Sequence, residues 1–534
     1  MAVENVGQGE REAARMRAFR LVQEIQGGAP TAAADLQSLA ARARGHGWDE
    51  VVRAGLFGQA VDAWYRRDPG AAAAVDAFMQ RSQADNDVAM LAVALAMRSD
   101  PGFLGPGAAA GGEADLARAV VLLEQASGEP LERISGHTGC GIALAWRWLF
   151  ELADEQYAAA LDVGSSQPSG ALDFILAPVM FNRAELQLAW ASVLHQLGDR
   201  QGVAERWRSW RAAGVAAAAC TMPPPWQAEL AAQGLLLAAI AGEDTAEDAR
   251  QRLGRLGRLA PPGEAEVRVG SFLRLAAALS DARAGRPGAL EAAEQAAQGI
   301  DPGIAPQVYD LALWLVAELT AEPGGAAGLR YGRRQLAQRW ADRLASLGAM
   351  QARIQAERLT QEREVLSRHA RLDDLTGVGN RRALEQYLAE AERMGVSSIA
   401  LILLDLNAFK EVNDRHGHPA GDTVLVRIAS ILERSVRPSD LALRLGGDEF
   451  AVVLAHADVD SACTRAADIL AQVDRQVFDD ISPGLVVDMS AGVAAGPPAA
   501  MTELRARADA ALYQAKAGGG QRVVRSRVAR AADA

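Results

Sequence analysis

The chain has 534 residues, a length that exceeds the usual size of one domain and predicts at least two separately packed units. Hydrophobic residues make up 50% of the chain and charged residues 23%, which excludes a wholly disordered protein. The formal net charge is -12 and no long basic run offsets it, so a nucleic-acid partner is not expected.

The cysteines and the apolar segments bear on the cellular location. The three cysteines, Cys140, Cys220 and Cys463, lie far apart, and their spacing predicts neither a disulfide framework nor a zinc site. Residues 1–20 lack the apolar segment of a secretory signal. Apolar segments such as residues 230–241 are too short to cross a bilayer. We therefore expect a cytoplasmic protein with no membrane partner.

Residues 1–330 are rich in Ala and Leu, with apolar residues at helical spacing. Residues 185–210 resemble one tetratricopeptide unit that turns at Gly198, and residues 275–293 form a weaker version that turns at Gly285. Such units bury their apolar faces by stacking. We expect an all-α, tetratricopeptide-like (TPR-like) array that senses a signal, binds a protein or peptide partner, or scaffolds a dimer. A generic helical bundle is the alternative.

Residues 331–372 form a charged helical stretch. It contains Trp340, the last of the ten tryptophans in the chain. Apolar residues recur along it every seven residues, with one phase slip: Trp340, Leu347, Ile354, Leu359 and Leu366. This pattern predicts a connecting signalling helix that forms a short parallel coiled coil. The alternative is one amphipathic helix packed on its own chain.

The remaining elements predict an α+β unit. The apolar run at residues 398–404 predicts a buried strand that ends in Asp405, followed by a short turn with Lys410 and a helix. Two strands then flank a hairpin turn at Gly446 and Gly447. A helix at 461–473, a strand at 485–491 and a helix at 502–517 complete the series. The order is close to β-α-β-β-α-β, a palm-like domain.

Two carboxylates in this unit have the positions that a metal site needs. Asp405 stands at a strand exit and Asp448 on the hairpin, and carboxylate oxygens are ligands that Mg²⁺ prefers. In nucleotidyl transfer, metal ions lower the pKa of an attacking hydroxyl and neutralise the triphosphate. The sequence therefore predicts such chemistry with Mg²⁺ or Mn²⁺.

Four ordered motifs carry a family resemblance. They are RLDDLTGVGNRRAL (371–384), LDLNAFKEVNDRHGHPAGDTVL (404–425), RPSDLALRLGGDEF (437–450) and ADAALYQAK (508–516). Together they resemble the GGDEF diguanylate cyclase family over about residues 366–524. The resemblance implies a cyclase domain at 373–526, followed by a tail at 527–534.

By this resemblance, a homodimer joins two GTP molecules into cyclic di-GMP and releases two pyrophosphates. The implied metal ligands are Asp405, Asp448, Glu449 and the backbone carbonyl of Leu406. The implied catalytic residues are Asp448, which accepts the proton of the 3′-hydroxyl, together with Lys410 and Glu449.

The resemblance also implies the substrate contacts. Asn413 and Asp422 match the positions that read guanine, whose N–H-bearing edge suits an amide and a carboxylate. Further substrate positions are Phe409, His418, Gly446 and Gly447, and the cations Lys410 and Lys516 face the triphosphate.

Arg437 and Asp440 are the first and last residues of an RxxD segment that begins nine residues before Gly446, and the resemblance implies that it is the family's inhibitory product site. The alternative for this segment is an exposed ion pair. The alternative for the whole protein is a catalytically weak or silent cyclic di-GMP receptor or scaffold.

Two positions depart from the family pattern. Asn407 stands where many members carry a second Asp, and Gly520 where an Arg often follows the last motif. Gly520 removes a possible triphosphate contact, although Arg522 could reach inward, so we expect weaker GTP binding rather than inactivity.

Overall fold

The computed structural model describes residues 2–66, 68–99, 109–167, 170, 172–218, 222–256, 264–321, 326–481, 485–517 and 522–526. It divides into two compact units, Met1–Arg358 and Leu359–Ala534. The division falls inside the predicted connecting helix. Cys220 and Gly520, both named in the sequence predictions, lie outside the described residues.

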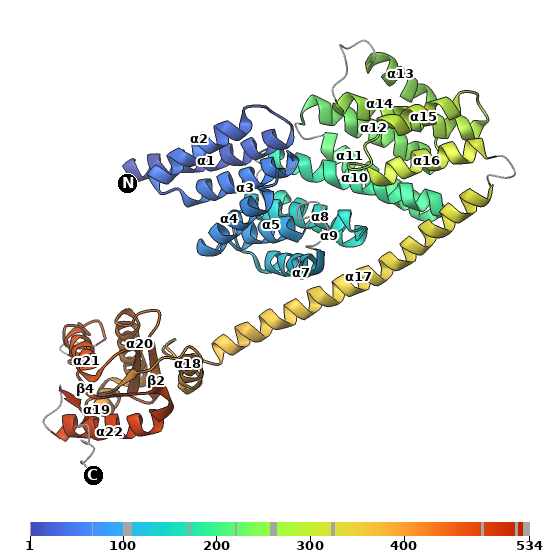
Figure 1. The fold of residues 1–534 in the computed structure, drawn as a ribbon. Coiled ribbons are helices and arrows are strands. Elements are labelled where there is room, and N and C mark those ends of the chain that lie inside the picture. The colour runs from blue at the N-terminus through green and yellow to red at the C-terminus, as the bar shows by residue number, and fades with distance from the viewer. Residues whose placement is uncertain are drawn as a thin grey trace. The chain divides into compact units, whose positions relative to one another are not determined.

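The described part of the first unit is built from helices, as predicted (Figure 1). Helices that follow one another pack side by side, for example α8 with α9 and α10 with α11. The helices are α1 (Ala2–Gln26), α2 (Ala32–His46), α3 (Asp49–Tyr65), α4 (Ala71–Ala84), α5 (Val88–Ser99), α7 (Ala109–Gln125), α8 (Pro130–Trp146), α9 (Phe150–Ser165), α10 (Asp173–Leu197), α11 (Arg200–Ala218), α12 (Pro224–Ala241), α13 (Ala246–Leu256), α14 (Glu264–Ala284), α15 (Ala289–Gly299) and α16 (Pro306–Thr320).

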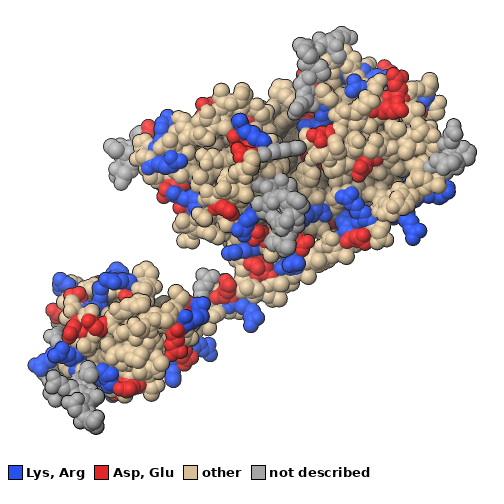
Figure 2. Space-filling model, viewed as in Figure 1, with Lys and Arg blue, Asp and Glu red and all other residues tan. Residues whose placement is uncertain are grey.

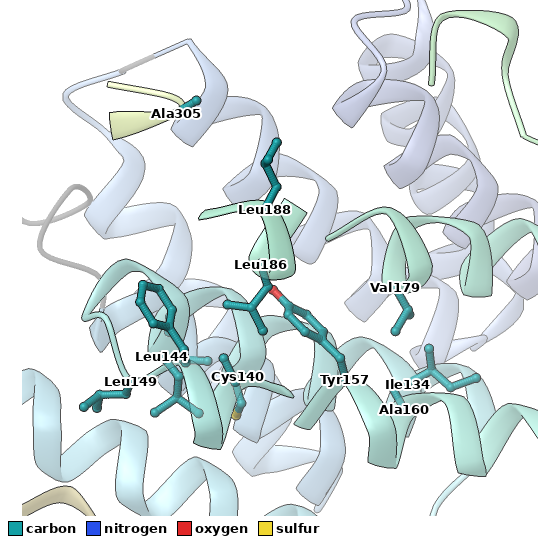
Figure 3. Close-up of a cluster of buried hydrophobic side chains, with 14 of the residues drawn as sticks. Ile134, Cys140, Leu144, Leu149, Tyr157, Ala160, Val179, Leu186, Leu188 and Ala305 are labelled. Atoms are coloured by element: carbon teal, nitrogen blue, oxygen red, sulfur yellow. The ribbon is translucent and has the colours of Figure 1, made fainter. Parts of the chain in front are cut away.

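The core of this unit explains the abundance of small residues. Figure 3 shows side chains from α8, α9 and α10 meeting in one cluster, among them Ile134, Tyr157 and Leu186, all nearly inaccessible to solvent. Gly141 lies against Tyr157, where an added Cβ would stand 2.5 Å from the ring. A side chain at this position would separate α8 from α9. Each large side chain buried in this way contributes about 1.5–3 kcal/mol.

Both predicted helical hairpins form. Helices α10 and α11 turn at Gly198, whose φ of 80° suits glycine, and α14 and α15 are separated by a turn at Gly285 with φ of 66°. The prediction of an all-α array is therefore confirmed. The tetratricopeptide assignment stays a prediction.

The connecting segment is one continuous helix, α17 (Ala326–His369). Its first part packs into the core of the first unit: Met350 and Ile354 are buried there, and Trp340 and Leu347 are partly buried. Leu359 and Leu366, after the phase slip, are 50% and 67% exposed. The first heptads therefore pack on their own chain, which was the alternative to the predicted coiled coil. Pairing of the later residues with a second copy stays a prediction.

The second unit holds a mixed sheet with strand order β2-β3-β1-β4-β5. Strand β5 runs parallel to β4, and the other pairs are antiparallel. The strands are β1 (Ile399–Leu406), β2 (Leu441–Gly446), β3 (Glu449–Ala455), β4 (Met489–Gly496) and β5 (Val523–Arg525). The helices are α18 (Arg381–Arg393), α19 (Phe409–His416), α20 (His418–Arg434), α21 (Val459–Asp474) and α22 (Met501–Ala517), with a 3-10 turn at Pro498–Ala500.

The predicted palm-like order is confirmed, with two differences in detail. The strand expected at 485–491 is β4, which begins at Met489 and continues to Gly496 because it pairs along the whole of β1. The short turn after Asp405 consists of Asn407 and Ala408, and the helix α19 follows at once.

Strand β1 is buried along its whole length, and its alternate residues enter two separate cores. Ala400, Ile402, Leu404 and Leu406 pack with residues of α20 and α21. Ile399, Leu401 and Leu403 pack with residues of α22 and α18. Asp405 has the parity of the second set, so it emerges on the α22 side of the sheet.

The helices, the surface charges and the cysteines bear on the expectations about membrane, nucleic acid and disulfides. Among the described residues, no helix is both long and apolar enough to cross a membrane. Figure 2 shows acidic and basic side chains interspersed over both units on the face in view. Cys140 is buried, and burial raises the pKa of its thiol to about 12; Cys463 is partly buried and its thiol pKa is also raised by burial.

Candidate active site

Asp405 is the last residue but one of the buried strand β1, which ends at Leu406, and strand pairing decides what surrounds it. Its partners across the sheet are Glu449 on β3 and Ser490 on β4. Residues directly opposite one another in antiparallel strands project to the same face. Asp405 is 6% exposed. The register therefore brings the predicted metal ligands Asp405 and Glu449 to one end of the sheet.

Lys516 of α22 forms an ion pair with Asp405, with Nζ 2.7 Å from Oδ1. Burial raises the pKa of the Asp405 carboxyl above its usual value; Lys516 opposes this shift and the nearby Asp448 carboxylate adds to it. The resemblance assigns Lys516 to the triphosphate and Asp405 to a metal ion. In this structure the lysine neutralises the carboxylate, so a cation at Oδ1 has to displace it.

The hairpin that carries Asp448 depends on glycine. Gly446 and Gly447 have φ angles of 145° and 57°, which L side chains rarely adopt. Arg444 holds the turn, because its Nε and Nη2 donate to the Gly447 carbonyl at 2.9 and 2.8 Å. Its Nη1 donates to Asp373 at 3.0 Å. Asp373 belongs to the first of the four family motifs, at residues 371–384. This motif therefore stabilises the hairpin through Arg444.

Asp373 is held as a carboxylate by its neighbours. Burial works against ionisation, but hydrogen bonds from Thr376 and Arg444 outweigh it and lower the pKa of this carboxyl. Thr376 donates to Asp373 from both its hydroxyl, at 2.6 Å, and its backbone N–H, at 3.0 Å. The ion pair with Arg444 is therefore present in its charged form at neutral pH.

A cavity of about 450 Å³ opens between these elements. It brings together six predicted site residues from β1, α19, the hairpin and α22. Its lining consists of Asp405, Leu406, Asn407, Ala408, Phe409, Lys410, Asp448, Asp488 and Lys516. The other predicted site residues, among them Glu449 and Asn413, do not belong to this lining.

The predicted guanine-reading residues lie on α19 and at the start of α20. Asn413 is partly buried, whereas His418 and Asp422 are exposed. Gly421 packs against Asn413, since an added Cβ would stand 2.0 Å from its Oδ1. Glycine at this position thus leaves room for the Asn413 amide. The base-reading roles stay predictions.

In the RxxD segment, Asp440 fixes the backbone. Its Oδ2 accepts from the backbone N–H of Arg437 at 3.0 Å, and its Oδ1 accepts from that of Ala455 at 3.1 Å. The Arg437 side chain is exposed. The Ser439 hydroxyl also donates to Asp440 Oδ1, at 3.4 Å. No described ion pair joins Arg437 to Asp440, so the segment differs from the simple exposed ion pair considered as its alternative.

Asp488 is a cavity residue that the sequence predictions missed. It precedes β4, and its Oδ1 accepts from Asn407 Nδ2 at 2.5 Å. Asn407 Oδ1 in turn accepts from the Ser490 hydroxyl at 2.8 Å. No motif marks Asp488, because its position beside the cavity results from the pairing of β4 with β1. Only the register between β4 and β1 could have indicated that Asp488 lies at the cavity. The strand predicted at residues 485–491 includes Asp488, but no role was predicted for this residue.

The donor set of the cavity fits a divalent cation. Its lining includes the carboxylates of Asp405, Asp448 and Asp488, together with Leu406. No compact group of three or more His, Cys, Asp or Glu side chains suited to a metal occurs among the described residues. Mg²⁺ usually takes one or two protein carboxylates and completes its shell with phosphates and water. The residues present therefore suit an ion that arrives with a nucleotide.

The predicted compensation for Gly520 finds no support at Arg522. Gly520 itself lies outside the described residues. Arg522 is exposed and does not belong to the cavity lining. Its carbonyl accepts from the backbone N–H of Ala491, which aligns β5 with β4. Weaker GTP binding stays a prediction.

Comparisons with known proteins agree on the second unit. Residues 370–522 match the family described as diguanylate cyclase, GGDEF domain. A Streptomyces griseus protein, the "uncharacterized protein in hutH 5′ region", is 36% identical over 203 residues, which cover 36% of this chain and 83% of that protein. Diguanylate cyclase TpbB from Pseudomonas aeruginosa is 38% identical over 179 residues, which cover 32% of this chain and 40% of TpbB.

A solved structure matches the same region. It contains the coiled coil and GGDEF domain of DgcB from Caulobacter crescentus in complex with c-di-GMP. The identity is 33%, the match covers 35% of this chain and 99% of that chain, and the TM-score is 0.30. The chain thus spans most of the first relative but less than half of TpbB, and each of these matches covers little more than a third of this chain or less.

Proposed function

The chain belongs to the GGDEF domain family, and from this membership we propose that it is a diguanylate cyclase that converts two GTP molecules into cyclic di-GMP and two pyrophosphates. The observation that carries the proposal is the cavity in which Asp405, Asp448, Lys410 and Lys516 meet. Carboxylates for a metal ion and cations for phosphate oxygens in one cleft are what nucleotidyl transfer needs.

In each of the two transfer steps, the 3′-oxygen of one GTP forms a bond to the α-phosphorus of the other. The bond between that phosphorus and the oxygen bridging to the β-phosphate breaks, and pyrophosphate leaves. Asp448 accepts the proton of the 3′-hydroxyl. Asp405, Asp448, Glu449 and the Leu406 carbonyl would hold Mg²⁺ or Mn²⁺, which would supply positive charge for the phosphate oxygens.

The remaining site residues hold the substrate. Lys410 and Lys516 bind the triphosphate, with Lys516 moving from Asp405 to phosphate when a cation arrives. Asn413 and Asp422 read the guanine edge, and Phe409, His418, Gly446 and Gly447 complete the contact surface. Each domain holds one GTP, so two chains have to face one another, and the active species is a homodimer.

Residues 1–330 regulate this dimer through the connecting helix at 331–372, ahead of the cyclase domain at 373–526 and the tail at 527–534. A heptad seam of α17 packs on the first unit of the same chain: Leu336, Trp340, Arg343, Leu347, Met350 and Ile354. A parallel coiled coil would bury these residues against a second copy. The two arrangements compete for one surface, so an input to the helical array that releases α17 favours the dimer.

Product inhibition is assigned to Arg437 and Asp440. Asp440 holds the backbone of the segment, and the exposed Arg437 guanidinium can form two parallel hydrogen bonds with guanine or phosphate. Arg437→Ala should therefore lower affinity for cyclic di-GMP, measured by calorimetry, and keep initial cyclase rates. Unchanged product affinity would remove this assignment.

The central experiment incubates the purified full chain with GTP and Mg²⁺ and detects cyclic di-GMP by mass spectrometry. Asp448→Asn should abolish the product, whereas Asp468→Asn, an exposed substitution on α21, should not. A folded dimer that binds cyclic di-GMP but makes none would instead support the alternative, a silent receptor or scaffold.

A further inference from the structure

Asp488 is the carboxylate of the cavity to which neither the sequence motifs nor the proposed reaction gives a role. It lies one residue before β4, opposite Asn407 at the end of β1. The Asn407 backbone N–H donates to the Asp488 carbonyl at 3.0 Å, which extends the ladder between β1 and β4 by one step. Asp488 lines the cavity together with Asp405, Asp448 and Lys516.

Asn407 is fixed at three atoms. In addition to its backbone bond, its Nδ2 donates to Asp488 Oδ1 at 2.5 Å and its Oδ1 accepts from the Ser490 hydroxyl at 2.8 Å. Asn407 directly follows Leu406, whose carbonyl is a proposed metal ligand. The carboxylate of Asp488 therefore restrains the backbone next to the proposed ligand carbonyl.

The side chains at positions 407 and 488 are complementary as a neutral hydrogen-bond donor and a charged acceptor. An amide donates to a carboxylate, but two carboxylates at this separation repel one another and cannot both ionise readily. An Asp at 407 would therefore conflict with Asp488. The amide at 407 and the carboxylate at 488 act as a matched pair that keeps one negative charge at this corner of the cavity.

We propose that Asp488 is a positioning residue of the nucleotide and metal cleft, which takes over the negative charge that Asn407 lacks and orients the backbone at Leu406. This inference rests on the proposed function. Among the described residues, none donates a hydrogen bond to Asp488 Oδ2, so one oxygen holds Asn407 and the other is available to accept from a hydrated cation in the cavity.

The test exchanges the two side chains. Asp488→Asn removes the charge, Asn407→Asp places two carboxylates together, and the double variant Asn407→Asp with Asp488→Asn restores one amide and one carboxylate. Asp474→Asn, at the exposed end of α21, is the matched control. Each full-length variant is titrated with Mn²⁺ and a GTP analogue that carries a methylene between the α- and β-phosphates, and bound Mn²⁺ is measured by electron paramagnetic resonance.

Each single variant should raise the half-saturating Mn²⁺ concentration about tenfold, because a hydrogen bond to a charged group is worth roughly 1.5–3 kcal/mol. The double variant should recover most of this loss. The proposal is wrong if Asp488→Asn binds Mn²⁺ like Asp474→Asn, or if the double variant binds no better than the weaker single one. Because the analogue is not turned over, these results do not depend on cyclase activity, whose failure would appear separately as a lack of product.

Discussion

At the scale of single residues, Asp405 places a carboxyl where its ionisation is costly. Burial raises its pKa above 3.8, the Asp448 charge adds to the shift, and the ion pair with Lys516 offsets only part of it. A carboxyl whose pKa is higher in the folded than in the unfolded state stabilises the fold below its unfolded pKa. That contribution is lost as the pH rises through the folded pKa.

The raised pKa of Asp405 predicts how the stability of Asp405→Asn depends on pH. Without divalent cations, the variant should resemble the wild type in thermal stability at pH values below 3.8 and should become relatively more stable as the pH rises toward neutrality. The measurement is the melting temperature of the full chain as a function of pH, without divalent cations. The unfolding transition of the second unit is identified beforehand as the one that a nucleotide analogue with Mg²⁺ shifts in the wild type. A difference that stays constant with pH would contradict the raised pKa.

Gly421 allows the base-reading role to be tested without removing a base-reading side chain. An alanine Cβ would stand 2.0 Å from Asn413 Oδ1, and the easiest relief is rotation of the Asn413 amide. Gly421→Ala should therefore raise the KM for GTP about tenfold, the loss of roughly one hydrogen bond, with a small change in melting temperature. Gly348→Ala on α17 places its Cβ in open space and should leave KM unchanged.

At the scale of elements, the close approach of β4 to α22 depends on Gly492. An added Cβ would lie 2.1 Å from the Ala508 carbonyl oxygen and 2.3 Å from the Leu512 nitrogen, and neither backbone atom can rotate away. Gly492→Ala should destabilise the second unit by about 1–3 kcal/mol or more. Gly496→Ala meets only the flexible end of Leu504, at 3.0 Å, and should cost less in a urea titration.

The same strand shows where sequence reasoning stops. The buried strand β1 and the glycine hairpin were predictable, because an apolar run and a Gly-Gly turn are local signals. Strand β4 was placed at 485–491 instead of Met489–Gly496, since small residues such as Ala491, Gly492 and Ala494 carry little strand propensity. Their strand state comes from pairing with β1. Asp488 was missed for the same reason, because only that register brings it to the cavity.

The partner of the predicted coiled coil could not be inferred from the sequence either. A heptad repeat reports that one face of a helix is buried but not which partner buries it. On α17, Ile354 is buried and Trp340 and Leu347 are partly buried by the same chain, whereas Leu366 is exposed. Sequence spacing does not distinguish these residues. The distinction depends on helices α7 to α9, which are remote in sequence.

At the scale of the whole molecule, α17 is held on the first unit by polar contacts as well as apolar ones. Arg343 is 5% exposed and pairs with both oxygens of Glu151, at 2.6 and 3.0 Å. Its guanidinium lies 3.9 Å from the centre of the Trp340 ring. Farther along, Arg353 pairs with Glu113 at 3.1 Å and Arg358 pairs with Glu124. Arg343 is the most deeply buried of these cations, and loss of Glu151 would leave its guanidinium without a carboxylate partner, so this is the ion pair whose loss most weakens the docking.

Glu151→Arg should therefore release α17 and shift the chain from monomer toward dimer. The released seam is apolar at Leu336, Leu347 and Ile354 and can pair with a second copy. Sedimentation velocity at several protein concentrations should show a dimer fraction that rises several-fold over wild type, and cyclic di-GMP production per chain should rise with it. The charge-exchanged variant Glu151→Arg with Arg343→Glu restores the pair and should return both quantities toward wild type. A released helix that stays monomeric would mean that the docked seam does not compete with dimerisation, and the first unit would then act on the cyclase by another route.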